Sequence, residues 1–196
     1  MSQMVGKMGR LVWIDCEMTG LDHEKQRLVE IAVILTDKDL NIIAEGPDIV
    51  INQPEEVLDN MEDWSRRTFA ENGLLSKIRE SKIDMKQAED MDSSRFLIVL
   101  VVILDFLANE TVKQACPLAG NSVHLDRRFI SKYMPRLDKH LHYRIVDVST
   151  IKELAARWYP KEFKKAPLKR QTHRALDDIR ESIEELRYYR SSIFHQ

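Results

Sequence analysis

Three apolar runs rich in strand-forming residues open the chain, and no other feature constrains its fold as much. They occupy residues 10–16, 28–36 and 42–51. The polar segment 37–41 between the second and third runs has the composition of a hairpin loop. Because neighbouring strands joined by short loops pair antiparallel, we expect an antiparallel meander at the start of the fold.

Predicted helices and short strands alternate through the rest of the chain. Strands are expected at residues 117–120 and 144–148, where short apolar runs lie between turn residues. The pattern Thr150-Ile-Lys-Glu153 is typical of a capping box and predicts the start of a helix. The predicted helical segments are 55–107 with a break at Asn72-Gly73, 125–134, 150–158 (apolar face Ile151, Leu154, Ala155 and Trp158) and 175–189. This alternation predicts an α/β protein, in which a mixed sheet with an opening antiparallel meander is flanked by helices.

The whole chain has the size and charge of one ordinary domain. Its 196 residues suit a single domain, expected over residues 1–196 with a core at about 10–190. A net charge of −2 argues against a protein that coats long nucleic acid with a broad basic surface. Cys16 and Cys116 lack a metal-ligand spacing, and the first ten residues lack the apolar core of a secretory signal. We therefore expect an intracellular protein, cytoplasmic or mitochondrial.

Acidic residues lie at the end of the first strand and recur later in the chain. Asp15 and Glu17 stand two apart, so both carboxylates point to one face of the strand, where they suit Mg²⁺ or Mn²⁺. The alternative is a strand end at which both acids are simply hydrated. Asp126 falls near the first turn of a predicted helix, where it is either a further ligand or a helix-dipole partner. His173 lies five residues before Asp178, so we expect the histidine in the loop before the last helix, leaning over the site.

Together these segments resemble the DEDDh exonucleases, which have a ribonuclease-H-like fold. Four blocks are similar to the oligoribonuclease family in particular: WIDCEMTGLD (13–22), GNSVHLDRRFI (120–130), HYRIVDVSTIKEL (142–154) and HRALDDIRESIEEL (173–186). The resemblance implies a 3′–5′ exoribonuclease that degrades short oligoribonucleotides, dinucleotides in particular, to mononucleotides. It implies two divalent metal ions, Mg²⁺ or Mn²⁺, that activate a water and stabilise the leaving 3′-oxygen. Carried over residue by residue, the metal ligands are Asp15, Glu17, Asp126 and Asp178.

The resemblance also assigns roles around these ligands. His173 is expected to accept the proton of the attacking water, and Glu17 and Tyr143 join it as catalytic residues. The expected substrate contacts are Leu21 as a wedge between bases, Trp64 as a stacking surface, and Ser122, Tyr143, Arg144 and Ser149 at the far phosphate. Some of the last group come from a second subunit in the family, so short single-stranded RNA and a homodimer partner are expected. Without the family resemblance, Trp64 could equally be a core residue. Tyr143 could be a packed aromatic ring, and Arg144 a charged residue on the surface.

One segment departs from the family. Residues 91–104 include the apolar run 96–104, whereas the family has an amphipathic helix at this place. We interpret the segment as an insertion, or as the product of an altered gene model or splice form. A membrane span needs about 20 apolar residues, so we expect a buried segment and no membrane. Two other functions stay open from the sequence. One is a general 3′–5′ DNA or RNA exonuclease, and the other is a nucleic-acid-binding protein with an impaired site.

Overall fold

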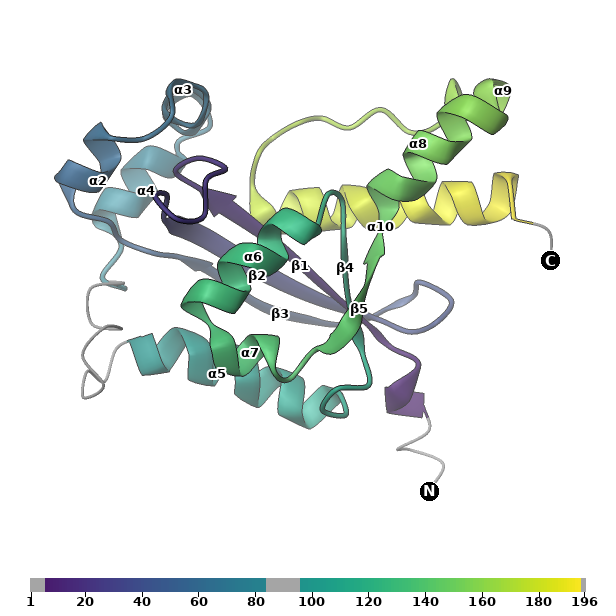
Figure 1. Cartoon of the computed structure of the whole chain (residues 1–196), viewed down its shortest axis with the longest axis horizontal. Coiled ribbons are helices and arrows are strands. Elements are labelled where there is room, and N and C mark those ends of the chain that lie inside the picture. The colour runs from purple at the N-terminus through teal and green to yellow at the C-terminus, as the bar shows by residue number, and fades with distance from the viewer. Residues whose placement is uncertain (1–5, 84–95, 195–196) are drawn as a thin grey trace.

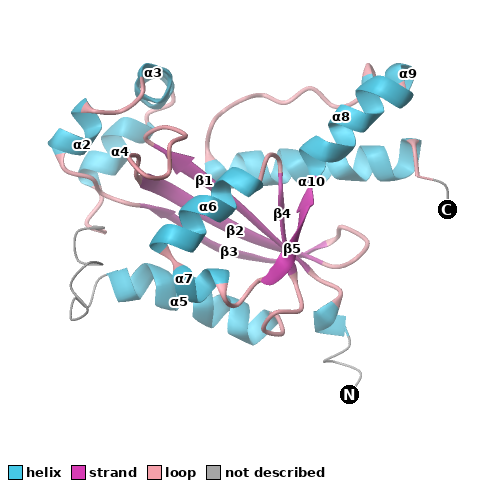
Figure 2. Cartoon of the chain, in the orientation of Figure 1, coloured by secondary structure: helices cyan, strands magenta, loops and turns pink. Residues whose placement is uncertain are grey.

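The computed structural model describes residues 6–83 and 96–194 and contains a five-stranded sheet (Figures 1 and 2). The strand order is β3-β2-β1-β4-β5. β1 pairs antiparallel with β2, and β2 with β3, whereas the β1–β4 and β4–β5 pairs are parallel. The strands are β1 (Leu11–Met18), β2 (Leu28–Thr36), β3 (Ile42–Val50), β4 (Pro117–Gly120) and β5 (His142–Asp147). The predicted mixed sheet with an opening meander is therefore confirmed.

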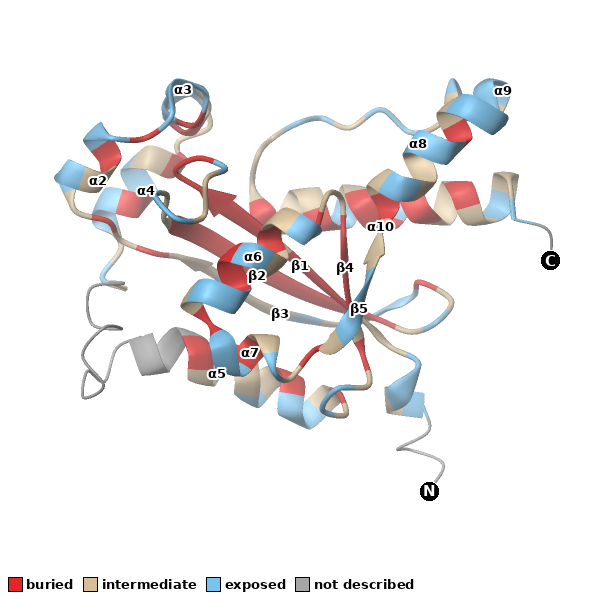
Figure 3. Ribbon diagram, in the orientation of Figure 1, coloured by how far each residue is buried: buried red, intermediate tan, exposed pale blue. Residues whose placement is uncertain are grey.

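The two faces of β1 belong to different parts of the core. Cys16 and Met18 join one apolar cluster, while Trp13 joins the cluster on the other face. Since side chains alternate along a strand, Asp15 and Glu17 share the face of Trp13. β2 is buried along its whole length, whereas the edge strands β3 and β5 are partly exposed (Figure 3).

Helices cover both faces of this sheet (Figure 1). On the face of Cys16, the core includes residues of α5 (Phe96–Glu110), α6 (His124–Tyr133) and α7 (Pro135–Asp138). On the face of Trp13, it includes residues of α8 (Val148–Trp158) and α10 (Ala175–Ser192). The short helix α9 (Pro160–Phe163) follows α8.

Three short helices form a separate cap beside the end of β1. They are α2 (Glu55–Asp59), α3 (Asp63–Glu71) and α4 (Leu74–Glu80). The cap has its own small core, built around Val29 of β2 and Phe69 of α3. Gly73 adopts φ of 77°, a left-handed conformation that glycine enters without steric cost, so the predicted break at Asn72-Gly73 is confirmed. The amide of Glu62 donates to the carbonyl of Thr19 at 2.9 Å and thereby fixes α3 next to the end of β1.

Two expectations for α8 are wrong. The helix begins at Val148 and not at Thr150, because the side chain of Asp147 accepts a hydrogen bond from the amide of Ser149 and caps the helix three residues before Thr150, the cap that the capping-box pattern predicts. Trp158 is 66% exposed and Leu154 is 37% exposed, so only Ile151 and Ala155 of the expected apolar face are turned toward the core.

The apolar run 96–104 lies in α5. Residues 91–95, the first part of the segment that departs from the family, fall outside the described part of the chain. Leu100, Ile103 and Leu107 are buried against the sheet, whereas Val102 is 42% exposed. The ring of Phe106 lies against Gly46 of β3 so closely that a Cβ at Gly46 would come within 2.6 Å of it. The predicted burial is therefore confirmed for one face of α5. Among the described helices, none has both the length and the apolar character that crossing a membrane requires.

Candidate active site

The first site acids lie inside β1, because the strand continues through Glu17 to Met18 and does not end at Cys16 as predicted. Asp15 and Glu17 line a pocket of about 380 Å³ at the carboxyl end of the strand. Asp178 from α10 and His173 from the preceding loop line the same pocket. Ligand atoms of Glu17, His173 and Asp178 all lie within 4.8 Å of one another. The fold thus brings residues from both ends of the chain to one point.

Asp126 reaches this site from the first turn of α6. It is buried, and its Oδ1 accepts a hydrogen bond from the amide of Cys16 at 2.9 Å. This contact places the carboxylate against the backbone between Asp15 and Glu17, although Asp126 does not itself line the pocket. The alternative of a simple helix-dipole partner does not explain why the acid is buried against β1.

Burial acts on all four carboxylates, and repulsion among them acts on Asp15 and Glu17. Burial, followed by the charges of Asp126, Glu17 and Asp178, raises the pKa of Asp15 well above its usual value. Burial and the charge of Asp178 do the same to the pKa of Glu17. Burial raises the pKa of Asp126 to about 7 and that of Asp178 to about 6. The folded protein therefore holds these carboxylates in an environment that disfavours their negative charge.

This donor set fits a divalent metal. Carboxylate oxygens are the ligands that Mg²⁺ and Mn²⁺ prefer, and a cation at this point would compensate the charges that burial and repulsion disfavour. Hydrated acids at a strand end, the alternative from the sequence, would be exposed. Glu17 is instead only 8% exposed, and Asp15 is partly buried.

His173 lies in the loop before α10, as predicted. Its backbone has φ of 49°, a left-handed conformation that is uncommon for residues other than glycine. Its ring meets the ring of Trp64 edge to face, with the centroids 4.9 Å apart. The imidazole therefore stands between α3 and the acids.

Leu21 and Trp64 form apolar walls of the pocket. Leu21 is 61% exposed and Trp64 is 52% exposed, although both are large hydrophobic residues. The alternative that Trp64 belongs to the core is therefore wrong. Both side chains are accessible to a ligand that enters beside the acids.

The four residues expected at the far phosphate fall into two groups. Ser122 and Ser149 lie together, since the amide of Ser122 donates to Oγ of Ser149 at 2.9 Å. Tyr143 and Arg144 lie elsewhere, and both are exposed; none of the four residues lines the pocket of the acids. The β4–β5 register jumps over them, from His142 opposite the first residue of β4 to Ile145 opposite the second. They therefore form a bulge near the amino end of the parallel strands, whereas the acids lie at the carboxyl end of β1.

The structure adds residues that the sequence did not reveal. Glu62 lines the pocket, and its Oε1 accepts a hydrogen bond from the amide of Leu21 at 3.2 Å. Lys169, which the sequence places in a basic loop, is half-buried and donates to Oδ1 of Asn121 at 2.9 Å. Its positive charge partly offsets the rise in the pKa values of Asp15 and Asp178. Glu62 has no spacing that connects it with the acids, and Lys169 is one of several basic residues that precede His173, so the sequence does not single it out.

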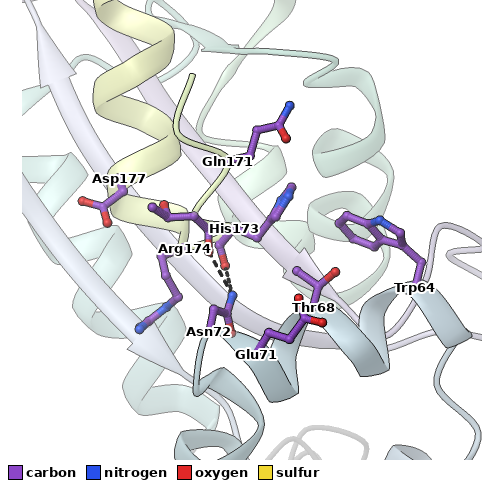
Figure 4. A pocket seen from close by; sticks show the side chains of 9 residues that line it. Trp64, Thr68, Glu71, Asn72, Gln171, His173, Arg174 and Asp177 are labelled. Atoms are coloured by element: carbon purple, nitrogen blue, oxygen red, sulfur yellow. Dashed lines mark hydrogen bonds between the residues drawn. The ribbon is translucent and has the colours of Figure 1, made fainter. Parts of the chain in front are cut away.

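A second pocket of about 570 Å³ lies on the other side of His173 (Figure 4). It shares Trp64 and His173 with the first pocket, and Asn72 lies in its wall. Figure 4 shows Asn72 below the loop of His173, with hydrogen bonds to the loop backbone.

Comparison with known proteins gives the class first. The family model described as Exonuclease matches residues 12–186, so the chain is an exonuclease. Solved structures agree on the fold: E. coli exonuclease I in complex with a dA16 oligonucleotide has a TM-score of 0.68 at 12% identity, over 94% of this chain and 41% of that one. The zinc-bound form of the same enzyme with single-stranded DNA has a TM-score of 0.67 at 12% identity, over the same shares. This chain thus spans about two fifths of exonuclease I, and the likeness confirms the ribonuclease-H-like fold.

Closer relatives identify the group within this class. The mitochondrial oligoribonuclease of Homo sapiens is 52% identical over 185 residues, which cover 94% of this chain and 73% of that protein. A probable oligoribonuclease of Caenorhabditis elegans is 58% identical over 94% of this chain and 89% of that protein. The oligoribonuclease of Haemophilus influenzae is 52% identical, over 92% of both chains. The chain therefore belongs to the oligoribonuclease family, the 3′–5′ exoribonucleases that act on short oligoribonucleotides.

Proposed function

We propose that this chain degrades oligoribonucleotides of a few residues, dinucleotides in particular, to mononucleotides from the 3′ end. One observation carries the proposal: Asp15, Glu17, Asp178 and His173 line one pocket at the end of β1, which Leu21 and Trp64 wall, and the carboxylate of Asp126 binds the backbone of the same strand. The pocket, of about 380 Å³, has room for the terminal part of an oligonucleotide beside the acids.

In this proposal, Asp15, Glu17, Asp126 and Asp178 hold two divalent ions, Mg²⁺ or Mn²⁺. When bound, such ions supply charge neutralisation at the phosphodiester and a water that is readily deprotonated. We propose two ions and not one because four carboxylates provide enough ligands for a pair of ions. The raised pKa values of these acids mean that the ions also keep the carboxylates charged at neutral pH.

His173 acts as the general base in this proposal. An imidazole exchanges protons near neutral pH, and a nitrogen of its ring lies within 4.8 Å of a carboxylate oxygen of both Glu17 and Asp178. The ring takes the proton of the attacking water, and Glu17 beside it orients that water. Positioning and charge compensation supply most of the rate in phosphoryl transfer.

Two apolar residues and a polar cluster determine substrate length. Leu21 separates the two bases and Trp64 stacks on one of them, an interaction worth about 1–3 kcal/mol per base. Ser122 and Ser149 bind the far phosphate end. Tyr143 and Arg144 complete that end from a second subunit of a homodimer, with Tyr143 also contributing to catalysis. A site that captures both ends of a dinucleotide discriminates against longer strands.

Hydrolysis of a 5′-labelled RNA ladder, from two to about ten nucleotides, tests this proposal. The ladder is incubated with Mg²⁺, with Mn²⁺, with EDTA, and with the Asp15→Asn protein. We expect the dinucleotide to disappear fastest, only with metal, and not with Asp15→Asn. Activity that grows with length contradicts the preference for dinucleotides. A deoxyribodinucleotide cleaved as fast as the ribodinucleotide contradicts the restriction to RNA.

Three further expectations stay predictions: a single exonuclease domain over residues 1–196, assembly as a homodimer, and an intracellular location, cytoplasmic or mitochondrial. The names of relatives from Homo sapiens and Bos taurus include the word mitochondrial, which supports the second location. Limited proteolysis, light scattering and microscopy of the tagged protein test these points in turn.

A further inference from the structure

We propose that Asn72, at the end of α3, is a positioning residue that holds the backbone of His173 in its left-handed conformation. The inference rests on the proposed role of His173 as general base. It assigns to α3 a second task beside presenting Trp64 to the substrate.

The contacts of Asn72 support this role. Its Nδ2 donates to the carbonyl of Thr172 at 3.0 Å and to the carbonyl of His173 at 2.8 Å. Its Oδ1 accepts from the amide of Leu74 at 3.0 Å, which fixes the side chain to the start of α4. Both N–H groups of the amide are thus directed to the loop of His173 (Figure 4), while its oxygen binds the turn of Asn72 itself.

The loop needs such support. Gln171 has φ of 56° and His173 has φ of 49°, so two residues with side chains adopt left-handed backbone within three positions. Such a residue strains the backbone and persists only where the surroundings fix it. An unsupported loop would relax toward ordinary backbone angles, and the imidazole would leave its place beside Glu17 and Asp178.

A second anchor holds the other side of His173. The guanidinium of Arg174 pairs with Glu30 at 2.5 Å, and the amide of Ala175 donates to the same carboxylate at 3.2 Å. Glu30 is fully buried in β2, opposite Glu17 in the strand register. This anchor fixes the start of α10 but makes no contact with the carbonyls of Thr172 and His173, so Asn72 alone, among the side chains described here, holds them.

Trp64 completes the arrangement at the other end of α3. Its edge-to-face contact restrains the ring of His173, while Asn72 restrains the backbone of the same residue. One helix therefore fixes both the position and the orientation of the imidazole.

The test compares Asn72→Ala with Asn52→Ala. Asn52 is a matched control because it is also half-buried and its Nδ2 also donates to two carbonyls, those of Ile78 at 2.8 Å and Arg79 at 3.2 Å, outside the site. For the ribodinucleotide with Mg²⁺, we expect Asn72→Ala to lower kcat by about 10- to 100-fold with unchanged KM. Asn52→Ala should leave both constants unchanged. Asn72→Ser, which keeps one donor, should give an intermediate kcat and serves in place of the alanine variant if that protein does not fold.

The second readout needs neither metal nor substrate. In NMR spectra of the metal-free protein, the edge-on indole of Trp64 shifts the ring signals of His173. We expect Asn72→Ala to move these signals toward the values of an unstructured histidine and Asn52→Ala to leave them in place. Unchanged His173 signals, or a kcat loss equal in both variants, would overturn the proposal. His173→Ala is measured alongside: full activity of that protein refutes the general base, while the NMR comparison still decides the role of Asn72.

Discussion

At the scale of single residues, the buried carboxylates predict how the metal-free protein responds to pH. The pKa of Asp126 is about 7 and that of Asp178 about 6, whereas an unfolded aspartate titrates near 4. Because the folded state binds these protons more tightly, the stabilisation is complete below pH of about 4 and is lost as the pH rises to about 7. We expect the Tm of the metal-free protein to fall between pH 5 and pH 8, and Mn²⁺ added at pH 8 to raise it again. Thermal unfolding with and without EDTA measures both effects.

Asp126→Asn isolates the contribution of one carboxylate. The amide oxygen of asparagine can still accept the hydrogen bond from Cys16, but the side chain no longer titrates. We expect this variant to have a flatter Tm profile between pH 5 and pH 8, a higher metal-free Tm at pH 8, and no hydrolysis. Asp37→Asn is the control: hydrogen bonds from Asn41 lower the pKa of Asp37, so this carboxylate changes stability with pH only in acid, and its variant should keep the shape of the wild-type Tm profile between pH 5 and pH 8. An unchanged profile in Asp126→Asn would contradict the origin assigned to the pH effect.

Trp64 gives a second prediction at this scale. Loss of a stacked base costs about 1–3 kcal/mol, so Trp64→Ala should raise the KM for a ribodinucleotide by about 5- to 150-fold. Trp64→Phe should keep most of the binding because the ring remains. Trp158→Ala is the matched control, since Trp158 is similarly exposed but lies at the end of α8, outside the pocket. Equal KM values for Trp64→Ala and Trp158→Ala would exclude stacking on Trp64.

At the scale of elements, substitutions in α5 should change the free energy of unfolding without changing catalysis. Ile103 is fully buried against the sheet, so Ile103→Ala should lower the free energy of unfolding by about 2–5 kcal/mol. Val102 on the same helix is 42% exposed, and Val102→Ala should change it by less than about 0.5 kcal/mol. Because α5 contributes no residue to the pocket, kcat per folded molecule should be the same in both variants. Urea titration and active-site titration measure the two quantities, and tolerance of Ile103→Ala would show that α5 does not pack as described.

The elements also show which features the sequence can predict. The meander and β4 follow from local apolar patterns, and His-x₄-Asp spacing correctly predicted that His173 lies outside α10. The start of α8 was mispredicted because two capping signals, Asp147 and Thr150, compete within four residues, and only the geometry at the end of β5 decides between them. Asn72, Glu62 and Lys169 could not be predicted, because their partners lie far away in the sequence and are polar groups without a periodic pattern.

At the scale of the whole molecule, the position of Tyr143 predicts a site shared between subunits. Tyr143 is 74% exposed and lies at the opposite end of the parallel strands from the acids, so it can serve a pocket only in another copy of the chain. Asp15→Asn and Tyr143→Ala should each be inactive alone.

Coexpressed with different tags, the two variants should form mixed dimers, each with one intact site. With random pairing half of the dimers are mixed, so about a quarter of wild-type activity should return. Coexpressed Asp15→Asn and Asp178→Asn, which damage the same pocket, should stay inactive in every pairing. Full activity of Tyr143→Ala alone, or no recovery in purified mixed dimers, would refute the shared site.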